Sequence, residues 1–342
     1  YSTIDKINSQ ISLSLNRKKW NINASYNYTD GTYWYRRVNN GIFLESDSLT
    51  AFDNHAEIDK RSANQNGNLN IGYKINKQTT LSLEGSLRNT YSHRIDSLEF
   101  YWDYNGLYDK SNTRNTNYDE FRRNAIGQFN LSYKNKKGHS IKLLSRINGI
   151  INPRESNFIE PYILQKEYKN FLAQTFVNQI DIELPIVKAK NDSSEVKFLT
   201  LETGLKSAAR KFTEDYTLYN FNPASVAYEI QDEFTNSLNY DEEIYAAYGL
   251  FKAGNKSNKI STGIRAEHSN ITSETKSNNY NKRLINFFPS ASFVHNLSET
   301  TTLAFNYSKR IKRPRGKELN PIPTYSDPFT LRIGNADLVP EK

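Results

Sequence analysis

The sequence offers few side chains that could carry covalent chemistry. It contains no cysteine and five histidines, which are His55, His93, His139, His268 and His295. The lack of cysteine excludes disulfides, thiolate zinc sites, CxxC redox centres and cysteine nucleophiles. No histidine has a second histidine four residues later or a carboxylate at a recognised metal-ligand spacing. We therefore expect no enzyme, no resident metal and no cofactor.

Three groups of residues are the remaining candidates for chemistry. His93 lies near Asp96 and Glu99, where a histidine and a carboxylate could act as an acid–base pair. Two acidic groups could hold a divalent ion: Asp241-Glu242-Glu243, and Asp53 with Glu57 and Asp59. Neither has the spacing of a calcium loop. We interpret both acidic groups as solvated loop charge.

The elements that position these residues are predicted to be β-strands. The 342 residues include 42 asparagines, and 13% of them are aromatic, a composition that disfavours helix. Apolar side chains recur at every second position in twelve segments that come in six pairs, as in strands with two different faces. The segments are 7–15 with 20–28, 69–75 with 81–87, 125–133 with 141–149, 171–184 with 196–206, 244–253 with 260–268, and 287–294 with 303–311.

The connections between these segments alternate in length. Short turns join the two members of a pair, at 16–19, 135–138, 255–258 and 296–301 among others. Long polar loops join one pair to the next, at 31–64, 92–118, 152–169, 213–242 and 271–283. Strands of about ten residues with short turns at one end and long loops at the other are typical of transmembrane β-barrels. A large soluble β-protein is the alternative.

The sequence therefore predicts an all-β, transmembrane antiparallel β-barrel with about twelve visible strands. The long loops, including 31–64 and 213–242, are predicted to be extracellular and the short turns periplasmic. In the segment 303–311, Leu303, Phe305, Tyr307 and Ile311 are predicted to face lipid, and Thr302, Ala304, Asn306, Ser308 and Arg310 to face the lumen. A slip of one residue would place Asn306 and Arg310 in hydrocarbon.

Aromatic residues follow the ends of two predicted strands. They are Tyr33, Trp34 and Tyr35, and Tyr101 with Trp102. Aromatic girdles occupy this level in membrane barrels. The same rings could instead contact a ligand as part of extracellular binding loops. Both interpretations stay open, and these five residues are the candidate ligand contacts.

The charge balance is basic, with 45 Lys and Arg against 37 Asp and Glu, a net charge of +8 and an isoelectric point near 9.2. These side chains are scattered among acids, so we expect no nucleic-acid partner. The densest basic cluster, 309–317, follows a strand that leaves the membrane. We expect it to meet lipopolysaccharide phosphates by Coulomb attraction.

Four motifs follow the last predicted strand. They read Asn306-Tyr-Ser-Lys-Arg-Ile-Lys-Arg-Pro314, Glu318-Leu-Asn-Pro321, Tyr325-Ser-Asp-Pro328 and Gly334-Asn-Ala-Asp-Leu-Val-Pro-Glu341. Their order and spacing resemble TonB-dependent receptors of the outer-membrane β-barrel family, SusC-like transporters included. The family usually has other residues at Ala336, Asp337 and Val339. The motif positions, which we expect to be mostly structural, are Arg313, Pro314, Asn320, Pro321, Asp327, Pro328, Gly334, Asn335, Leu338, Pro340 and Glu341.

The resemblance implies an integral outer-membrane transporter that imports a scarce nutrient. It implies a 22-stranded barrel with an N-terminal plug, energised by TonB and its inner-membrane complex, with a surface lipoprotein lid as a further possible partner. The ligand, whether small molecule, peptide or glycan, would be captured by the extracellular loops. The alternatives are a passive porin or structural barrel subunit of a surface complex, and a secreted β-rich adhesin.

The chain is expected to be one part of a larger barrel domain. It contains no methionine and shows no signal peptide, and the plug, TonB box and C-terminal strands of the family are not recognisable in 1–342. Twelve strands followed by a proline-rich loop would leave the first and last strands as edges. Because edges exposed to lipid have unpaired backbone groups, we predict that 7–15 and 303–311 do not pair with each other.

Overall fold

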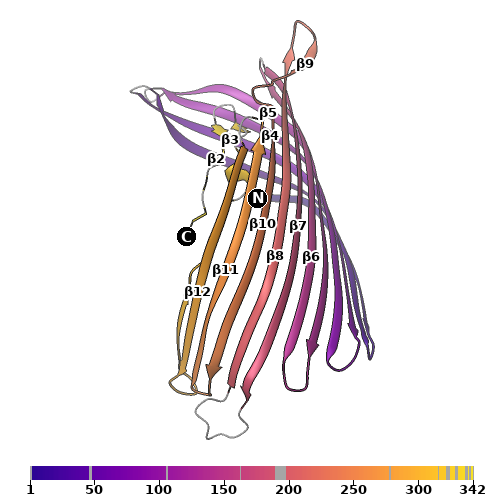
Figure 1. The fold of residues 1–342 in the computed structure, drawn as a ribbon. Helices are drawn as coiled ribbons and strands as arrows, with labels where there is room; N and C mark the ends of the chain where they lie inside the picture. Colours follow the sequence, from indigo (N-terminus) through magenta and orange to yellow (C-terminus); the bar gives the residue numbers. More distant parts are fainter. Residues whose placement is uncertain are drawn as a thin grey trace.

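The computed structural model describes residues 2–45, 48–104, 107–161, 163–188, 198–276, 279–314, 316–320, 324–327, 330–335, 338, 340 and 341. Almost all of this chain forms one antiparallel sheet (Figure 1). No helix in the described residues is long and apolar enough to cross a membrane, a finding that does not bear on strands.

The sheet follows the order of the chain. Its path is β1 (Ser2–Asn16), β2 (Trp20–Glu45), β3 (Ser48–Lys74), β4 (Thr79–Tyr104), β5 (Leu107–Lys134), β6 (Ser140–Glu160), β7 (Ile163–Lys188), β8 (Phe198–Asn222), β10 (Asn236–Gly254), β11 (Asn258–Thr275), β12 (Asn279–Asn296) and β13 (Thr302–Ser308). The short β9 (Ala227–Ile230) pairs with β8 beside this path. After β13 come α1 (Gly316–Leu319) and a separate hairpin of β14 (Thr324–Asp327) and β15 (Thr330–Arg332).

The twelve predicted strands are all present, but the predicted long loops are wrong. The segments 31–64 and 92–118 are continuous strand pairs, so that β2 to β5 each run for 26 to 28 residues. The segments 152–169, 213–242 and 271–283 are likewise mostly strand. Cross-strand hydrogen bonding continues beyond the length needed to span a bilayer. The last predicted strand is shorter than expected and ends at Ser308, before Ile311.

Asparagine side chains explain several of the short turns. The Asn76 side-chain oxygen accepts the backbone N–H groups of Gln78 and Thr79 at 2.8 and 2.9 Å. Asn255 does the same for the two residues that close the β10–β11 turn. Such side-chain bonds mimic a backbone turn, which is why asparagine is favoured there. In the β5–β6 turn, Gly138 has a positive φ of 94°, a conformation that favours glycine.

The short turns and the long extensions lie at opposite ends of the sheet (Figure 1). The turns after β1, β3, β5, β10 and β12 gather at one end. The extended ends of β2 to β8, with β9, lie at the other. This is the asymmetry expected of an exported barrel, whose periplasmic side is kept short.

One face of the sheet is an exposed apolar band. Antiparallel pairing places Ile147 beside Phe176 and Ile180 beside Leu205 on the same face. On β6 the band runs from Ile141 to Ile151, eleven residues in the sequence. At about 3.3 Å per residue and a tilt of about 45° these cover about 25 Å, the height of a barrel's lipid-facing band. We call this the outward face.

Aromatic side chains mark both edges of the outward band, although they are not the predicted ones. At the end with the short turns, Trp20 and Tyr73 pack with ring centroids 4.3 Å apart. At the other end, Tyr91 and Phe121 lie 4.7 Å apart. Trp34 is also on the outward face, but it lies farther along β2, six residues beyond Tyr28. The girdle position of Tyr33, Trp34 and Tyr35 stays a prediction.

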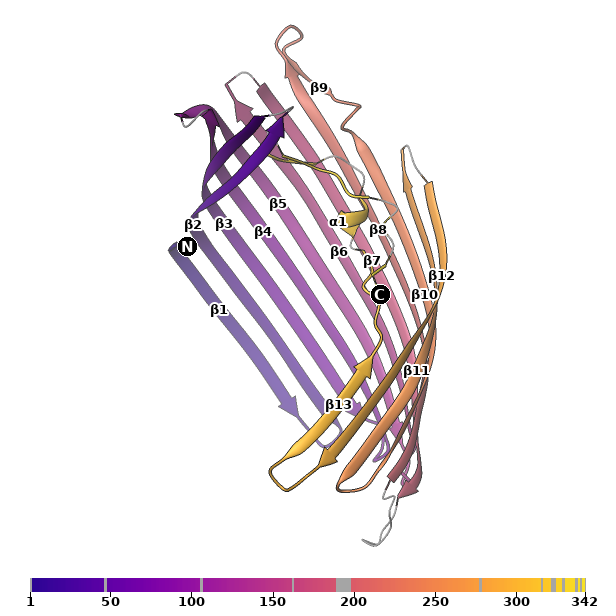
Figure 2. The same cartoon turned by 90° about the vertical axis from the view of Figure 1, so that its left-hand side faces the viewer.

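The sheet curves into an open arc (Figure 2). Within the described residues, β1 pairs with β2 and β13 pairs with β12, and the path ends at these two strands. The prediction that the segments 7–15 and 303–311 are not paired with each other is confirmed. The buried clusters lie on the concave, inward face; one contains Phe212, Tyr240 and Ile271, and the other Ile58, Leu98 and Phe100.

The pairing of β12 with β13 confirms the predicted faces of the last strand within β13. Phe305 lies beside Phe293 on the outward face, while the Ser292 hydroxyl donates to the side-chain oxygen of Asn306 at 2.7 Å on the inward face. Because the chain has no native cysteine, single-cysteine variants carry no background. We expect a bilayer-soluble thiol probe to label Phe305→Cys and Tyr307→Cys, and a water-soluble probe to label Asn306→Cys and Ser308→Cys. The reverse pattern would contradict the assignment of faces.

The second prediction concerns sidedness. A short epitope inserted between Ala224 and Ser225, in the exposed turn before β9, should bind antibody on intact cells, because the long extensions are expected outside. The same epitope between Ser298 and Glu299, in the β12–β13 turn, serves as the matched insertion and should bind only after the outer membrane is permeabilised. Antibody binding to the second insertion alone on intact cells would reverse the topology.

Candidate functional site on the inner wall

The inward face of the first strands is lined by hydrogen-bonded asparagine side chains. The Asn27 amide donates to Asn8 across β1 and β2 at 3.0 Å, and Asn23 donates to Asn21 along β2. Farther along the sheet, Asn130 donates to Ser82 at 3.0 Å and to Glu84 at 3.1 Å. These side chains alternate with the apolar outward residues. The composition rich in asparagine therefore serves the water-facing side of the wall.

A belt of ion pairs crosses the inward face from β4 to β11. Most of its carboxylates are almost completely covered, including those of Glu167, Glu214 and Glu242. A buried carboxylate is tolerated only when it is paired and hydrogen-bonded. The pairs are Arg94 with Asp96, Arg114 with Glu160, Arg154 with Glu167, Lys169 with Glu214, Arg210 with Glu242, and Arg265 with Glu267.

Tyrosine side chains on the inward face brace neighbouring strands of this wall. The Tyr248 hydroxyl on β10 donates to Asp181 on β7, across the intervening strand β8. Its ring covers Gly204 of β8, and a Cβ at that glycine would lie 2.5 Å from the Tyr248 ring. Glycine at 204 is therefore required by the close approach of the Tyr248 side chain.

The segment after β13 folds back on itself as a compact unit, residues 309–341, which we call the luminal segment. Its two ends meet: Lys312 and Glu341 exchange backbone hydrogen bonds of 2.9 and 3.0 Å and form a side-chain ion pair of 3.0 Å. In the middle, the Gly334 N–H donates to the Asn320 carbonyl at 2.7 Å and the Asn335 N–H to the Glu318 carbonyl at 2.8 Å. Figure 2 shows this segment inside the concave side of the arc.

Arg313 anchors the luminal segment to the wall. Its guanidinium lies 2.6 Å from Glu267 Oε2 and 3.2 Å from Glu242 Oε1, and donates to the Ser269 hydroxyl at 3.3 Å. Glu242 and Glu267 lie on the adjacent strands β10 and β11 and also pair with Arg210 and Arg265. One guanidinium thus ties the segment to two buried carboxylates through charge-assisted contacts. We call Arg313, Glu242, Glu267 and Ser269 the Arg313 clamp.

Apolar contacts support the Arg313 clamp. Leu319 is 5% exposed and belongs to the inward cluster that contains Phe212 and Tyr240. Pro314, Leu338 and Pro340 of the luminal segment line a small cavity against β10, β11 and β12. The segment is therefore held by both charge and apolar burial.

Most of the motif residues come together here. Arg313, Pro314, Asn320, Gly334, Asn335, Leu338, Pro340 and Glu341 all lie within the luminal segment, and Asn320 is buried. A Cβ at Gly334 would lie 2.7 Å from the Glu318 carbonyl oxygen and would also overlap Asn320, which explains glycine there. Asp327 is the last residue of β14, while Pro321 and Pro328 lie outside the described residues.

The expected contact of the basic cluster with lipopolysaccharide is wrong at Arg313. Its side chain turns to the inward face and pairs with wall carboxylates, because the chain folds back into the arc after β13. Arg310, by contrast, is exposed. The proline-rich segment is therefore not simply an external loop.

The predicted aromatic ligand contacts lie in strands, not in loops. Tyr33, Trp34 and Tyr35 belong to β2, and Tyr101 and Trp102 to β4. Tyr35 packs against the inward cluster of Ile58 and Phe100. The Tyr101 hydroxyl donates to Glu99 at 2.7 Å, and its ring lies 5.1 Å from His55. Their role as ligand contacts stays a prediction.

The other candidates from the sequence are rearranged. His93 contacts Asp119 of β5 at 2.8 Å on the outward face, whereas Asp96 pairs with Arg94 on the inward face. The proposed pairing of His93 with Asp96 is therefore wrong. The interpretation of Glu242 as solvated loop charge is also wrong, because it lies in β10 and is 4% exposed. Among the described residues, no group of His, Asp and Glu side chains could hold a metal ion.

Glu242 falls in the segment 213–242, for which the sequence predicts a loop, and extending the two-residue alternation of 244–253 backwards by two residues places it on the lumen face. Glu267 lies within the predicted strand 260–268, where the same alternation places it on the lumen face. Their partner Arg313 lies about fifty residues away from Glu267 in the chain, and no local pattern signals that contact.

Comparison with known proteins agrees with this arrangement. The sequence profile described as the outer membrane protein beta-barrel family matches residues 128–342, more than half of the chain. This chain belongs to the outer membrane protein β-barrel family. It is accordingly an integral protein of the outer membrane, and a secreted adhesin is excluded.

Two solved structures are weakly similar to this chain. The ferric citrate transporter FecA in its unliganded form has 10% identity and a TM-score of 0.48, over 88% of this chain and 43% of that one. The translocator domain of the autotransporter NalP from Neisseria meningitidis has 10% identity and a TM-score of 0.29, over 86% and 82%. The chain thus spans less than half the length of the FecA chain. No curated protein matches it.

The third prediction tests the Arg313 clamp of this outer-membrane barrel. Arg313→Met should lower the free energy of unfolding by about 1.5–3 kcal/mol, because Glu242 and Glu267 lose a shared charged partner but keep Arg210 and Arg265. The measurement is urea unfolding of the full-length protein in lipid vesicles, followed by tryptophan fluorescence.

Two further variants make the clamp prediction specific. Arg310→Met removes an exposed arginine three residues earlier and should leave stability unchanged. Adding Glu242→Gln and Glu267→Gln to Arg313→Met also removes the acidic partners of Arg210 and Arg265 and should lower stability further. Equal stability of Arg313→Met and Arg310→Met would contradict the clamp.

Proposed function

We propose that this chain forms part of the barrel wall of a non-enzymatic, TonB-dependent outer-membrane transporter that imports a scarce nutrient. The observation that carries the proposal is the luminal segment, which is held inside the arc by the Arg313 clamp. A passive channel needs an open water path, whereas in the widest barrels the lumen is plugged. Folded chain fixed on the inner wall favours the second kind of barrel.

The width of the arc supports the same proposal. In the part of the chain that the structure describes, twelve strands in one path leave β1 and β13 as edges. An edge in hydrocarbon has unpaired backbone groups that cost several kcal/mol each, so a closed barrel would need further strands. The resemblance of the motifs around Arg313 and Gly334 to TonB-dependent receptors adds the 22-stranded architecture, with a plug and a TonB-contacting region outside this chain.

In this function the extended strand ends capture the ligand. They form the wall above the membrane and carry Tyr33, Trp34, Tyr35, Tyr101 and Trp102, the proposed ligand contacts. TonB and its inner-membrane complex would drive passage, and a surface lipoprotein lid is a further proposed partner. A passive porin or a structural barrel subunit is the second candidate, favoured by the polar, asparagine-rich inner wall.

The fourth prediction separates a transporter from a porin. The full-length protein, purified from its own outer membrane, is placed in liposomes and osmotic swelling is followed with arabinose and glucose as probes. We expect no sugar-dependent swelling, because the lumen is occupied. Swelling at rates that fall with sugar size would favour a porin and contradict the proposal.

Two additions sharpen this test. Arg313→Met should release the luminal segment and raise sugar permeation, while Arg310→Met should not. The purified periplasmic domain of TonB should also bind the full-length protein on a sensor surface. A sealed barrel that shows no TonB binding would contradict the transporter and favour a structural subunit.

A further inference from the structure

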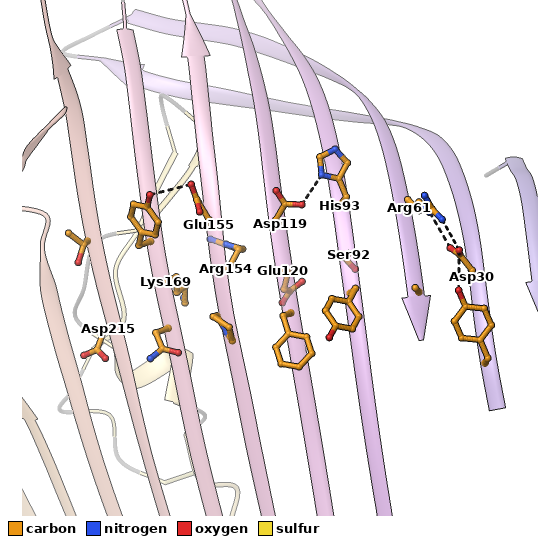
Figure 3. A pocket seen from close by; sticks show the side chains of 18 residues that line it. Asp30, Arg61, Ser92, His93, Asp119, Glu120, Arg154, Glu155, Lys169 and Asp215 are labelled. Atoms are coloured by element: carbon orange, nitrogen blue, oxygen red, sulfur yellow. Dashed lines mark hydrogen bonds and ion pairs between the residues drawn. The ribbon is translucent and has the colours of Figure 1, made fainter. Parts of the chain in front are cut away.

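A trough of about 730 Å³ lies on the outward face, across β2 to β8 (Figure 3). It is separate from the luminal site, because residues such as Tyr91, Phe121 and Tyr168 have the opposite parity from the wall residues that face Arg313. Its size is within the range of ligand pockets.

The sheet is irregular at the centre of the trough. Pairing of β5 with β6 stops at Arg123 with Ile151 and resumes at Glu120 with Arg154. Pro153 lies in this gap, and proline has no N–H to donate to a ladder. Phe121 and Pro153, which lie at this interruption, both line the trough.

The floor of the trough is aromatic. Tyr91 and Phe121 lie side by side with ring centroids 4.7 Å apart, and Tyr91 is 51% exposed. The Arg123 guanidinium lies 5.4 Å from the Phe121 ring centroid, and the Tyr91 ring keeps about half of its surface exposed. Aromatic faces of this kind suit the C–H faces of sugar rings, because apolar contact is combined with attraction between C–H groups and the negative face of the ring.

The rim of the trough carries oriented hydrogen-bonding groups. Asp119 is held by His93 at 2.8 Å, Glu155 by the Tyr168 hydroxyl at 3.2 Å, and Asp30 by Arg61 at 2.9 Å (Figure 3). Each contact fixes a carboxylate and leaves acceptor capacity for ligand hydroxyls. The lining of the trough includes five acids, with Glu120 and Asp215 among them, against three lysines and arginines and one histidine. This small excess of acceptors suits hydroxyl or amino groups better than phosphate.

The height of the trough identifies where such sugars come from. The apolar band ends on β6 at Ile151, which is level with Arg123 and Asn89, and Phe121 and Tyr91 lie two residues farther along β5 and β4. Two residues of tilted strand rise about 5 Å, which places the rings at the boundary between the hydrocarbon and the headgroups. On the predicted sidedness, this is the outer leaflet.

We propose that the trough binds the sugar headgroup of a glycolipid of the outer leaflet. The sugar ring lies on Tyr91 and Phe121, its hydroxyls donate to Asp119 and Glu155, and the acyl chains run down the apolar band. Binding at this site fixes the height of the barrel in the outer leaflet. It is independent of the proposed transport function.

The test measures glycolipid that stays bound. The full-length protein is extracted from its own outer membrane in mild detergent, and bound lipids are counted by native mass spectrometry. Tyr91→Ala with Phe121→Ala should reduce bound glycolipid about tenfold, as expected for the loss of two stacked rings. Tyr245→Ala, which removes an outward tyrosine of similar exposure outside the trough, should not. Equal retention in all three proteins would overturn the proposal.

Two further measurements decide the remaining outcomes. Asp119→Asn with Glu155→Gln alters only the rim and should also lower retention, so the proposal stays testable if the aromatic variant does not fold. Oligosaccharide released from the same glycolipid should bind the delipidated protein far more weakly than the glycolipid does. Oligosaccharide that binds as tightly as the intact glycolipid would make the trough a site for soluble glycans and overturn the membrane source. Bound protein in place of glycolipid would overturn the proposal as well.

Discussion

The pairing of backbone hydrogen-bonding groups is the constraint on which the rest of this structure depends. In hydrocarbon no water can satisfy an N–H or C=O group, so each strand must pair on both sides. In the described residues, the strands from β2 to β12 on the main path meet this requirement through their neighbours in the sheet, and β1 and β13 are paired on one side. The ladders continue past the apolar band for a related reason. Once two strands are aligned, each further residue pair adds hydrogen bonds without the entropy cost of closing a new loop.

The continuity of the sheet creates two chemically distinct surfaces. Alternation sends Phe176 and Ile180 to the lipid and leaves Glu167, Asp181 and Arg210 facing inward. Carboxylates on the lipid face would be too costly, whereas on the inward face they pair with arginines from adjacent strands. The luminal segment exploits those paired charges: Arg313 joins carboxylates that already have partners, so its docking adds a third charge to a network instead of burying an isolated one.

Features with a period of two were predictable from the sequence, and long-range contacts were not. The twelve strands, the faces of Phe305 and Asn306 and the open arc follow from alternation and turn positions. Residues 31–64 were interpreted as loop because polar side chains such as Asn64 and Asp59 occupy both faces there, outside the membrane, where alternation no longer has a lipid to select it. The Arg313 clamp joins residues from β10, β11 and the luminal segment. The sequence motifs after the last predicted strand include Arg313, but they do not identify Glu242 or Glu267 as its ion-pair partners.

The two faces of the sheet place different requirements on their side chains only as far as the end of the apolar band. Below it, outward side chains are selected by lipid; above it, the same strands can present charged and aromatic groups outward, as His93, Asp119 and Tyr91 do. A proline is also tolerated there, because a ladder gap at Pro153 is open to water instead of hydrocarbon. A ladder gap that would be costly at the level of Ile147 is therefore tolerated six residues farther along β6, at Pro153, which lines the outward trough.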